Sequence, residues 1–183
     1  FIGRLEKTKG CGEFVDGLIC LLQNAEVDGV IVGYGDMESD LRARISKAGM
    51  TDAIHVVGGI PHNEIPIALA AADIYVSLNQ FGNLSNTNLE AISQGKCMFI
   101  LDSDLDTHVD EETVELLPAD IFPRISRTNT AEDLARQVAE LLREPTRIEQ
   151  MSAETAAVGQ KMLSNWTDRI DREIGLIRDT IEP

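Results

Sequence analysis

Short apolar runs alternate with helix-forming segments along this chain, and this alternation limits the folds that it can adopt. Between the runs lie segments with helical apolar spacing, such as Phe14, Leu18 and Leu21. Buried runs separated in this way form parallel sheets joined by right-handed crossover helices. We predict an α/β, Rossmann-like three-layer domain with a central parallel sheet. Its strands are expected at residues 1–2 (the end of a truncated strand), 29–33, 54–57, 73–78, 97–101 and 121–125.

The length of 183 residues suits one domain with a substantial core. We therefore predict a single domain over 1–183, in which 146–183 form C-terminal helices. The other helices are expected at 14–22, 37–48, 61–72, around Glu90, and at 131–142. Three cysteines lack CxxC spacing and lie in or beside apolar stretches, which is typical of reduced thiols in a cytoplasmic protein.

A net charge of −15 argues against a nucleic-acid partner, because no broad basic face can be formed. A small phosphate ligand needs only local positive potential. Arg4, Lys7 and Lys9 directly follow the first predicted strand, and ligands of open parallel sheets bind beyond the carboxyl ends of the strands. The cluster suits a diphosphate, with Arg4 as a planar fork and Lys9 as a point charge. The alternative is a solvated loop.

The segment from Asn83 to Phe99 joins a polar, turn-prone run, a short helix and a buried strand. Open backbone N–H groups at such a helix start can hold an anion. Glu90, close behind, can accept hydrogen bonds from sugar or ribose hydroxyls. The same elements would also serve a merely structural helix start.

Glycines follow two of the other predicted strands, at Gly33-Tyr34-Gly35 and at Gly58-Gly59. The first group resembles a dinucleotide fingerprint but has Glu38 in place of the third glycine. We therefore interpret Gly33 as permitting a tight turn and close approach of a ligand.

Taken in order, these segments resemble the donor-binding C-terminal half of GT-B glycosyltransferases, in particular the retaining family 4, the glycosyl transferases group 1. The resemblance covers residues 1–101 and 131–177. It is carried by the segments Gly3–Gly10, Val32–Met50, Ile54–Asn79 and Asn86–Ile100. The chain would then be one half of a GT-B enzyme, a hexosyltransferase whose donor is a UDP-, GDP- or ADP-sugar.

The resemblance implies a role for each matching position. Arg4 and Lys9 match the catalytic pair that binds the donor diphosphate and steadies the departing nucleotide. Glu90 matches the second glutamate of the E-x7-E motif, which holds the ribose. The turn from Val57 to Pro61 would lie against the nucleobase, and the family uses no metal or cofactor. The other substrate-binding positions implied are Asn86, the backbone amides of Thr87, Asn88 and Leu89, and the turn residues Gly58 and Ile60.

The sequence also departs from the family pattern. Gly82 stands where the first glutamate should contact the transferred sugar, so these contacts must be rebuilt by Asn83, Ser85 or Asn86, or be absent. Cys97 replaces a customary proline. The N-terminal half, which binds the acceptor and through which family members often dock on membranes, is missing. We therefore expect the fragment alone to bind nucleotide weakly and not to catalyse transfer.

Two other functions stay open at this point. The first is a non-catalytic binding or scaffold module that kept the fold and lost the sugar site, for which Gly82 is the best support. The second is a metal-dependent transferase of the GT-A type, because the apolar run before Asp102 and Asp104 ends in the DxD pattern with which such enzymes hold Mn²⁺ or Mg²⁺.

Overall fold

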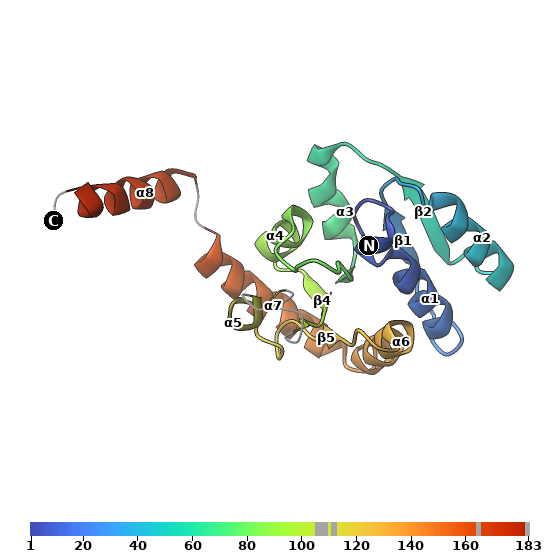
Figure 1. The fold of residues 1–183 in the computed structure, drawn as a ribbon. Coiled ribbons are helices and arrows are strands. Elements are labelled where there is room, and N and C mark those ends of the chain that lie inside the picture. Colours follow the sequence, from blue (N-terminus) through green and yellow to red (C-terminus); the bar gives the residue numbers. More distant parts are fainter. Residues whose placement is uncertain (105–109, 111–112, 164–165, 182–183) are drawn as a thin grey trace.

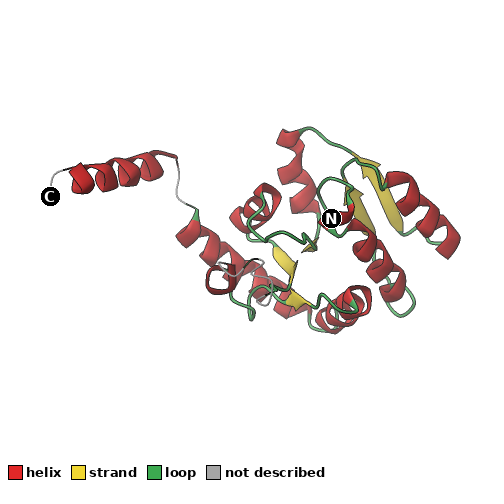
Figure 2. Cartoon of the chain, in the orientation of Figure 1, coloured by secondary structure: helices red, strands yellow, loops and turns green. Residues whose placement is uncertain are grey.

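The computed structural model describes residues 1–104, 110, 113–163 and 166–181. Within these ranges all strand pairs are parallel, and helices flank the strands (Figures 1 and 2). This confirms the predicted α/β class. The strands are β1 (Gly29–Val32), β2 (Ile54–Gly58), β3 (Ile74–Ser77), β4 (Cys97–Leu101) and β5 (Arg124–Ile125).

The helices largely follow the predicted segments, although α1 begins earlier than predicted and the 3-10 turn η1 was not predicted. The predicted helix over 61–72 is a short 3-10 turn followed by an α-helix, which has a proline in its first turn. A short helix that was not predicted, α5, precedes β5. The helices are η1 (Lys7–Lys9), α1 (Cys11–Leu21), α2 (Glu38–Ala48), η2 (His62–Glu64), α3 (Ile65–Ala71), α4 (Asn86–Ser93), α5 (Thr113–Leu116), α6 (Thr130–Leu141), α7 (Pro145–Met162) and α8 (Trp166–Ile181).

The predicted central sheet is divided in two. β1 pairs with β2, and β3, β4 and β5 form a second sheet in that order. Residues 1–2, expected to end a strand, contribute one isolated parallel bridge between Ile2 and Val32. The predicted last strand over 121–125 is shorter and comprises only Arg124 and Ile125.

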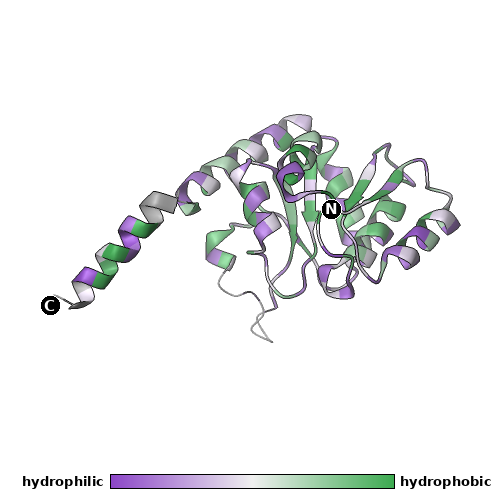
Figure 3. Ribbon diagram, turned by 90° about the horizontal axis from the view of Figure 1, so that it is seen from above, coloured by the Kyte–Doolittle hydropathy of each residue, from purple (hydrophilic) through white to green (hydrophobic). Residues whose placement is uncertain are grey.

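Two apolar clusters form the core. One gathers side chains of α1, α2 and α6 against the strands, and the other lies between α3, α4 and the opposite faces of β3 and β4. Every residue of β4 is buried, as its uninterrupted apolar sequence requires. Hydrophobic residues accordingly concentrate along the strands and on the inner faces of the helices (Figure 3).

The C-terminal stretch agrees with the prediction of helices over 146–183, of which 164–165 and 182–183 lie outside the described residues. α7 packs against α4 and β4, whereas α8 extends away from the body of the molecule (Figures 1 and 3). Ile170, Ile174 and Ile177 of α8 are exposed. None of the described helices is both long and apolar enough to cross a membrane.

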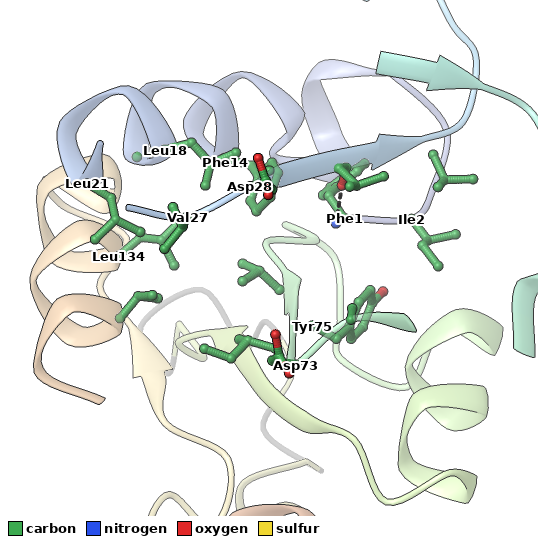
Figure 4. Close-up of a pocket in the computed structure, with 18 of the residues that line it drawn as sticks. Phe1, Ile2, Phe14, Leu18, Leu21, Val27, Asp28, Asp73, Tyr75 and Leu134 are labelled. Atoms are coloured by element: carbon green, nitrogen blue, oxygen red, sulfur yellow. Dashed lines mark hydrogen bonds between the residues drawn. The ribbon is translucent and has the colours of Figure 1, made fainter. Parts of the chain in front are cut away.

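Because the strands are parallel, the loops after β1, β2, β3 and β4 emerge at one edge of the molecule. We call this edge the rim. The predicted site residues lie in these loops, in the loop after residues 1–2, at the end of β2 or in α4. A groove of about 610 Å³ lies elsewhere, between β1 and β3, and is lined by none of them (Figure 4).

Candidate functional site at the rim

The basic loop after residues 1–2 runs across the rim and is held at both ends. The amide of Leu5 donates to the carbonyl of Tyr34 at 2.9 Å, in the loop after β1. At the other end the amide of Gln80, just after β3, donates to the carbonyl of Thr8 at 2.9 Å. These backbone bonds fix the path of the loop and place its cations over the ends of the strands.

Arg4 and Lys9 lie on this loop, and their charged groups are available to an anionic ligand. The Arg4 side chain is 65% exposed and pairs only with Glu6, at 2.9 Å, among the described residues. Exposed ion pairs of this kind contribute about 0–1 kcal/mol, so an anionic ligand can replace Glu6 at small cost. Lys9 Nζ lies 3.4 Å from the Asn79 side-chain oxygen at the exit of β3.

Close packing explains why residue 33 is a glycine. A Cβ at this position would lie 1.8 Å from the carbonyl oxygen of Gly3, so only glycine lets the two loops touch. The Gly33 amide also donates to the Gly58 carbonyl at 2.8 Å. The predicted contact of Gly33 with a ligand stays a prediction.

The predicted base-facing residues lie at the end of β2 and in the turn after it. The predicted turn over Val57–Pro61 begins too early, because Val57 and Gly58 still belong to the strand. Val57 is exposed, Ile60 is half-buried, and Gly58 has φ +80°, a conformation that favours glycine. The exposed ring of Tyr34 lies so close to Gly59 that a Cβ there would come within 2.8 Å of it. The turn and this aromatic ring therefore form one continuous surface.

The start of α4 provides the predicted anion site, although only part of it is open. Ser85 caps the helix, and its side-chain oxygen accepts from the Asn88 amide at 3.3 Å. The Leu89 amide donates to the Ser85 carbonyl at 3.0 Å. Of the predicted amides only that of Thr87 has no acceptor among the described residues, and the Asn86 amide beside it is equally open.

Glu90 is the most unusual group at the rim. Its Oε1 lies 3.4 Å from His62 Nε2, with the Glu90 side chain 25% exposed and that of His62 82% exposed. Its Oε2 is buried and has no hydrogen-bond partner among the described residues. A buried acceptor without a donor is costly, and a ligand hydroxyl that donates to Oε2 would remove this cost.

Asn88 is fully buried and serves the structure. Its side-chain oxygen accepts from the Tyr75 hydroxyl at 3.0 Å, and its side-chain nitrogen donates to the Asn83 carbonyl at 2.9 Å. Burial raises the pKa of Tyr75, so the hydroxyl stays protonated and can donate. Asn88 thus ties the start of α4 to β3 and to the preceding loop.

The loop that should contact the sugar is tied to a distant segment. Asn83 donates from its backbone to Asp110 Oδ1 at 3.1 Å and from its side chain to Asp110 Oδ2. The same Asp110 oxygen Oδ2 accepts from the Thr113 hydroxyl at 2.7 Å. Gly82 has φ +140°, and a Cβ there would lie 3.4 Å from Asp110 Oδ1. A carboxylate from another segment therefore stands beside the position where the family has its first glutamate.

Sequence reasoning missed three contributors to the rim. No local sequence pattern indicates that Asp110 contributes to the rim, because its partner Asn83 is 27 residues away. Arg127 is half-buried and binds the carbonyl of Asp102 at 2.7 Å. It also lies 3.4 Å from the Gln80 carbonyl, so it holds the exits of β3 and β4 together. Tyr34 lies between two glycines, and the sequence does not show that its ring lies close to Gly59.

No group of three or more His, Cys, Asp or Glu side chains within the described ranges is arranged to hold a metal ion. Asp102, from the predicted DxD alternative, is exposed, and its Oδ1 accepts from the Ser103 amide at 2.9 Å. Cys11 and Cys97 are buried and Cys20 is half-buried, all as free thiols.

The fold is that of the Rossmann-like domains of GT-B glycosyltransferases. Anabaena HepE in complex with UDP and glucose matches 98% of this chain and 47% of its own, with a TM-score of 0.78 and 16% identity. The C-terminal domain of LpcC, a glycosyl transferase group 1 family protein from Francisella tularensis, matches 88% of this chain and 83% of its own, with a TM-score of 0.72 and 18% identity. Identities this low establish the fold alone.

A family model described as glycosyl transferases group 1 matches residues 1–158, and the chain belongs to that family. The lipopolysaccharide core biosynthesis mannosyltransferase LpsB of Rhizobium meliloti (strain 1021) is 34% identical over 128 residues, 64% of this chain and 36% of LpsB. The 2-deoxystreptamine glucosyltransferase of Streptomyces kanamyceticus is 28% identical over 96 residues, 52% of this chain and 25% of that enzyme. The chain thus spans about a third or less of the curated relatives that it matches.

Proposed function

We propose that this chain is the donor-binding domain of a glycosyltransferase and binds a nucleoside diphosphate sugar at the rim. The observation that carries the proposal is the buried, unpartnered Oε2 of Glu90, which lies in the α4 helix whose first amides are open. A ribose hydroxyl would satisfy the carboxylate, and a phosphate would satisfy the amides. The names of the relatives, a mannosyltransferase and a glucosyltransferase, support a hexosyl donor.

The proposed reaction follows from the charges at the rim. Breaking the bond between sugar and phosphate builds negative charge on the leaving diphosphate. Arg4, Lys9 and the open amides of α4 would stabilise that charge more in the transition state than in the ground state. In the full-length protein we propose transfer of a hexosyl group, with retention of configuration, to a sugar, lipid or polysaccharide acceptor.

The remaining parts of the proposal concern the rest of the protein. We propose that an N-terminal domain supplies the acceptor site and the other wall of the cleft, so the 183-residue chain alone binds donor without turnover. We further propose that transfer needs no divalent metal and that the protein is cytoplasmic. Any association with a membrane would then run through the N-terminal domain.

Calorimetric titration of the chain with UDP, GDP and ADP, each with and without Mn²⁺, tests this function. We expect binding of one nucleotide without metal, and its loss in Arg4→Ala and Lys9→Ala. Lys47→Ala, at the exposed end of α2, removes the same charge away from the rim and should leave binding unchanged. Strict dependence on Mn²⁺ would instead favour the metal-dependent alternative with Asp102 and Asp104.

A second candidate, a non-catalytic binding module, has one observation in its favour. Asp110 occupies the neighbourhood of Gly82, where the family has a sugar-binding side chain. A chain that binds none of the three nucleotides would support this candidate and contradict the donor-binding proposal.

A further inference from the structure

The two oxygens of the Glu90 carboxylate have different surroundings. Oε1 lies 3.4 Å from His62 Nε2, at the surface, whereas Oε2 is buried without a hydrogen-bond partner. Within the part of the chain that the structure describes, His62 is the only polar partner of this carboxylate. Because both oxygens are bonded to one carbon, a partner that holds Oε1 also determines where Oε2 points.

Without His62 the carboxylate would gain hydrogen bonds by turning towards water. The Glu90 side chain is 25% exposed, so water is within its reach, and turning would end the cost of the unpartnered Oε2. The nearest buried hydroxyl does not remove this cost, because Tyr75 donates to the Asn88 side-chain oxygen at 3.0 Å. Burial and, to a smaller extent, the negative charge of Glu90 raise the pKa of Tyr75, so the carboxylate lies close to that hydroxyl without receiving its proton.

The backbone holds His62 beside α4, although its side chain lies outside the core. His62 begins η2 directly after Pro61, whose ring restricts φ, and the Glu64 amide closes this turn by donating to the Pro61 carbonyl at 2.9 Å. α3 follows η2 without a break and packs against α4, the helix that carries Glu90 (Figure 1). The His62 side chain is 82% exposed, so its replacement should leave the fold intact.

We infer that His62 is a positioning residue of the donor site, which holds the Glu90 carboxylate so that Oε2 faces the ribose hydroxyls of the nucleotide. The inference rests on the proposed function, because the proposed nucleotide supplies the hydroxyl that donates to Oε2. His62 acts through Glu90, so its contribution to affinity requires both the carboxylate and the ribose hydroxyls. A residue that merely stabilised its own loop would affect every ligand of the rim alike.

The test uses two matched variants, His62→Gln and His62→Asn, which place an amide nitrogen where the imidazole has Nε2 and Nδ1, respectively. Calorimetric titration measures their affinity for UDP, GDP and ADP and for the 2′,3′-dideoxy analogue of the nucleotide that the wild-type chain binds. We expect His62→Asn and His62→Ala to weaken nucleotide binding about threefold to fivefold, and His62→Gln to stay within about twofold of wild type. Affinity for the dideoxy analogue should be the same in all of them. His55→Ala, at an exposed histidine in β2, is the control.

A double variant checks that His62 acts through Glu90. Added to Glu90→Gln, His62→Ala should weaken nucleotide binding by less than about 1.5-fold, because the carboxylate that it positions is already lost. Equal losses for the nucleotide and its dideoxy analogue, or equal affinities of His62→Gln and His62→Asn, would overturn the inference. Nucleotide binding by the wild-type chain that His62→Ala leaves unchanged would also overturn it, while the proposed function would stand. A wild-type chain that binds no nucleotide would contradict the proposed function and the inference with it.

Discussion

Two sets of residues at the rim, which we call its two ends, use their hydrogen-bonding groups differently. At the end formed by Arg4, Glu90 and the start of α4, a guanidinium is exposed, two amides are open and one carboxylate oxygen is buried without a donor. At the end formed by Gly82, Asn83 and Asp110, the groups bind one another, apart from the Asn83 side-chain oxygen. Free hydrogen-bonding capacity is what a ligand can use, so we expect the first end to provide most of the affinity.

The largest effect is expected from the double variant Arg4→Ala/Lys9→Ala. Each cation would make charge-assisted hydrogen bonds to the diphosphate, and their joint loss should weaken nucleotide binding by at least about 100-fold. Calorimetric titration measures this, with Lys47→Ala as the control. A loss of affinity below about threefold would show that Arg4 and Lys9 do not bind the nucleotide. The expected difference in affinity between the two ends would then not exist.

Glu90→Gln should have the next largest effect. It keeps the shape of the side chain but loses the charge that strengthens acceptance from hydroxyls, so nucleotide affinity should fall about tenfold. The variant should also lose any preference for the nucleotide over its 2′,3′-dideoxy analogue. Glu64→Gln, at an exposed glutamate in η2, is the control. If Glu90→Gln retains the preference for the ribose hydroxyls, the hydroxyls are bound elsewhere.

Asn88→Ala tests whether the buried network is structural. It leaves the Tyr75 hydroxyl and the Asn83 carbonyl without their partners, so the free energy of unfolding should fall by about 2–3 kcal/mol. Urea denaturation measures this loss, and Tyr75→Phe, which removes one member of the pair, should cost less. Unchanged stability of Asn88→Ala would show that the network does not hold α4 in place.

The smallest effect on binding is expected at the sugar end, from Asp110→Asn. Because the Asp110 carboxylate is engaged with Asn83 and Thr113, the change should lower stability by about 1 kcal/mol. It should alter the affinity for a nucleoside diphosphate by less than about twofold. Asp102→Asn, an exposed aspartate after β4, provides the comparison. A tenfold loss of nucleotide affinity in Asp110→Asn alone would mean that the two ends act as one site.

The sequence predicts those features that depend on local patterns. The uninterrupted apolar run Cys97–Leu101 identifies β4, and the polar run before Leu89 identifies the start of α4. The common edge of the loops follows from parallel strands alone, and it brings Arg4 and Lys9 to the rim as expected.

The features that escaped prediction depend on contacts between distant segments. No local pattern shows that Asp110 binds Asn83, or that Arg127 reaches the carbonyl of Asp102. The sequence predicts an open backbone amide at Asn88. The capping of that amide by Ser85, and the contact of the buried side chain with Tyr75, become visible only in three dimensions. The division of the sheet is equally hidden, because the apolar sequences of β1 and β3, which border it, do not differ from those of paired strands.

The difference between the two ends is tested most directly by calorimetry on the wild-type chain. The measurement compares the affinity for one nucleoside diphosphate with that for its own sugar conjugate, for example UDP with UDP-glucose and GDP with GDP-mannose. We predict that one nucleotide binds and that its sugar conjugate has a Kd within about threefold of that of the nucleotide, because the sugar end adds little. A conjugate that binds more than about tenfold tighter than the free diphosphate would contradict the account and place the main binding energy at Gly82, Asn83 and Asp110.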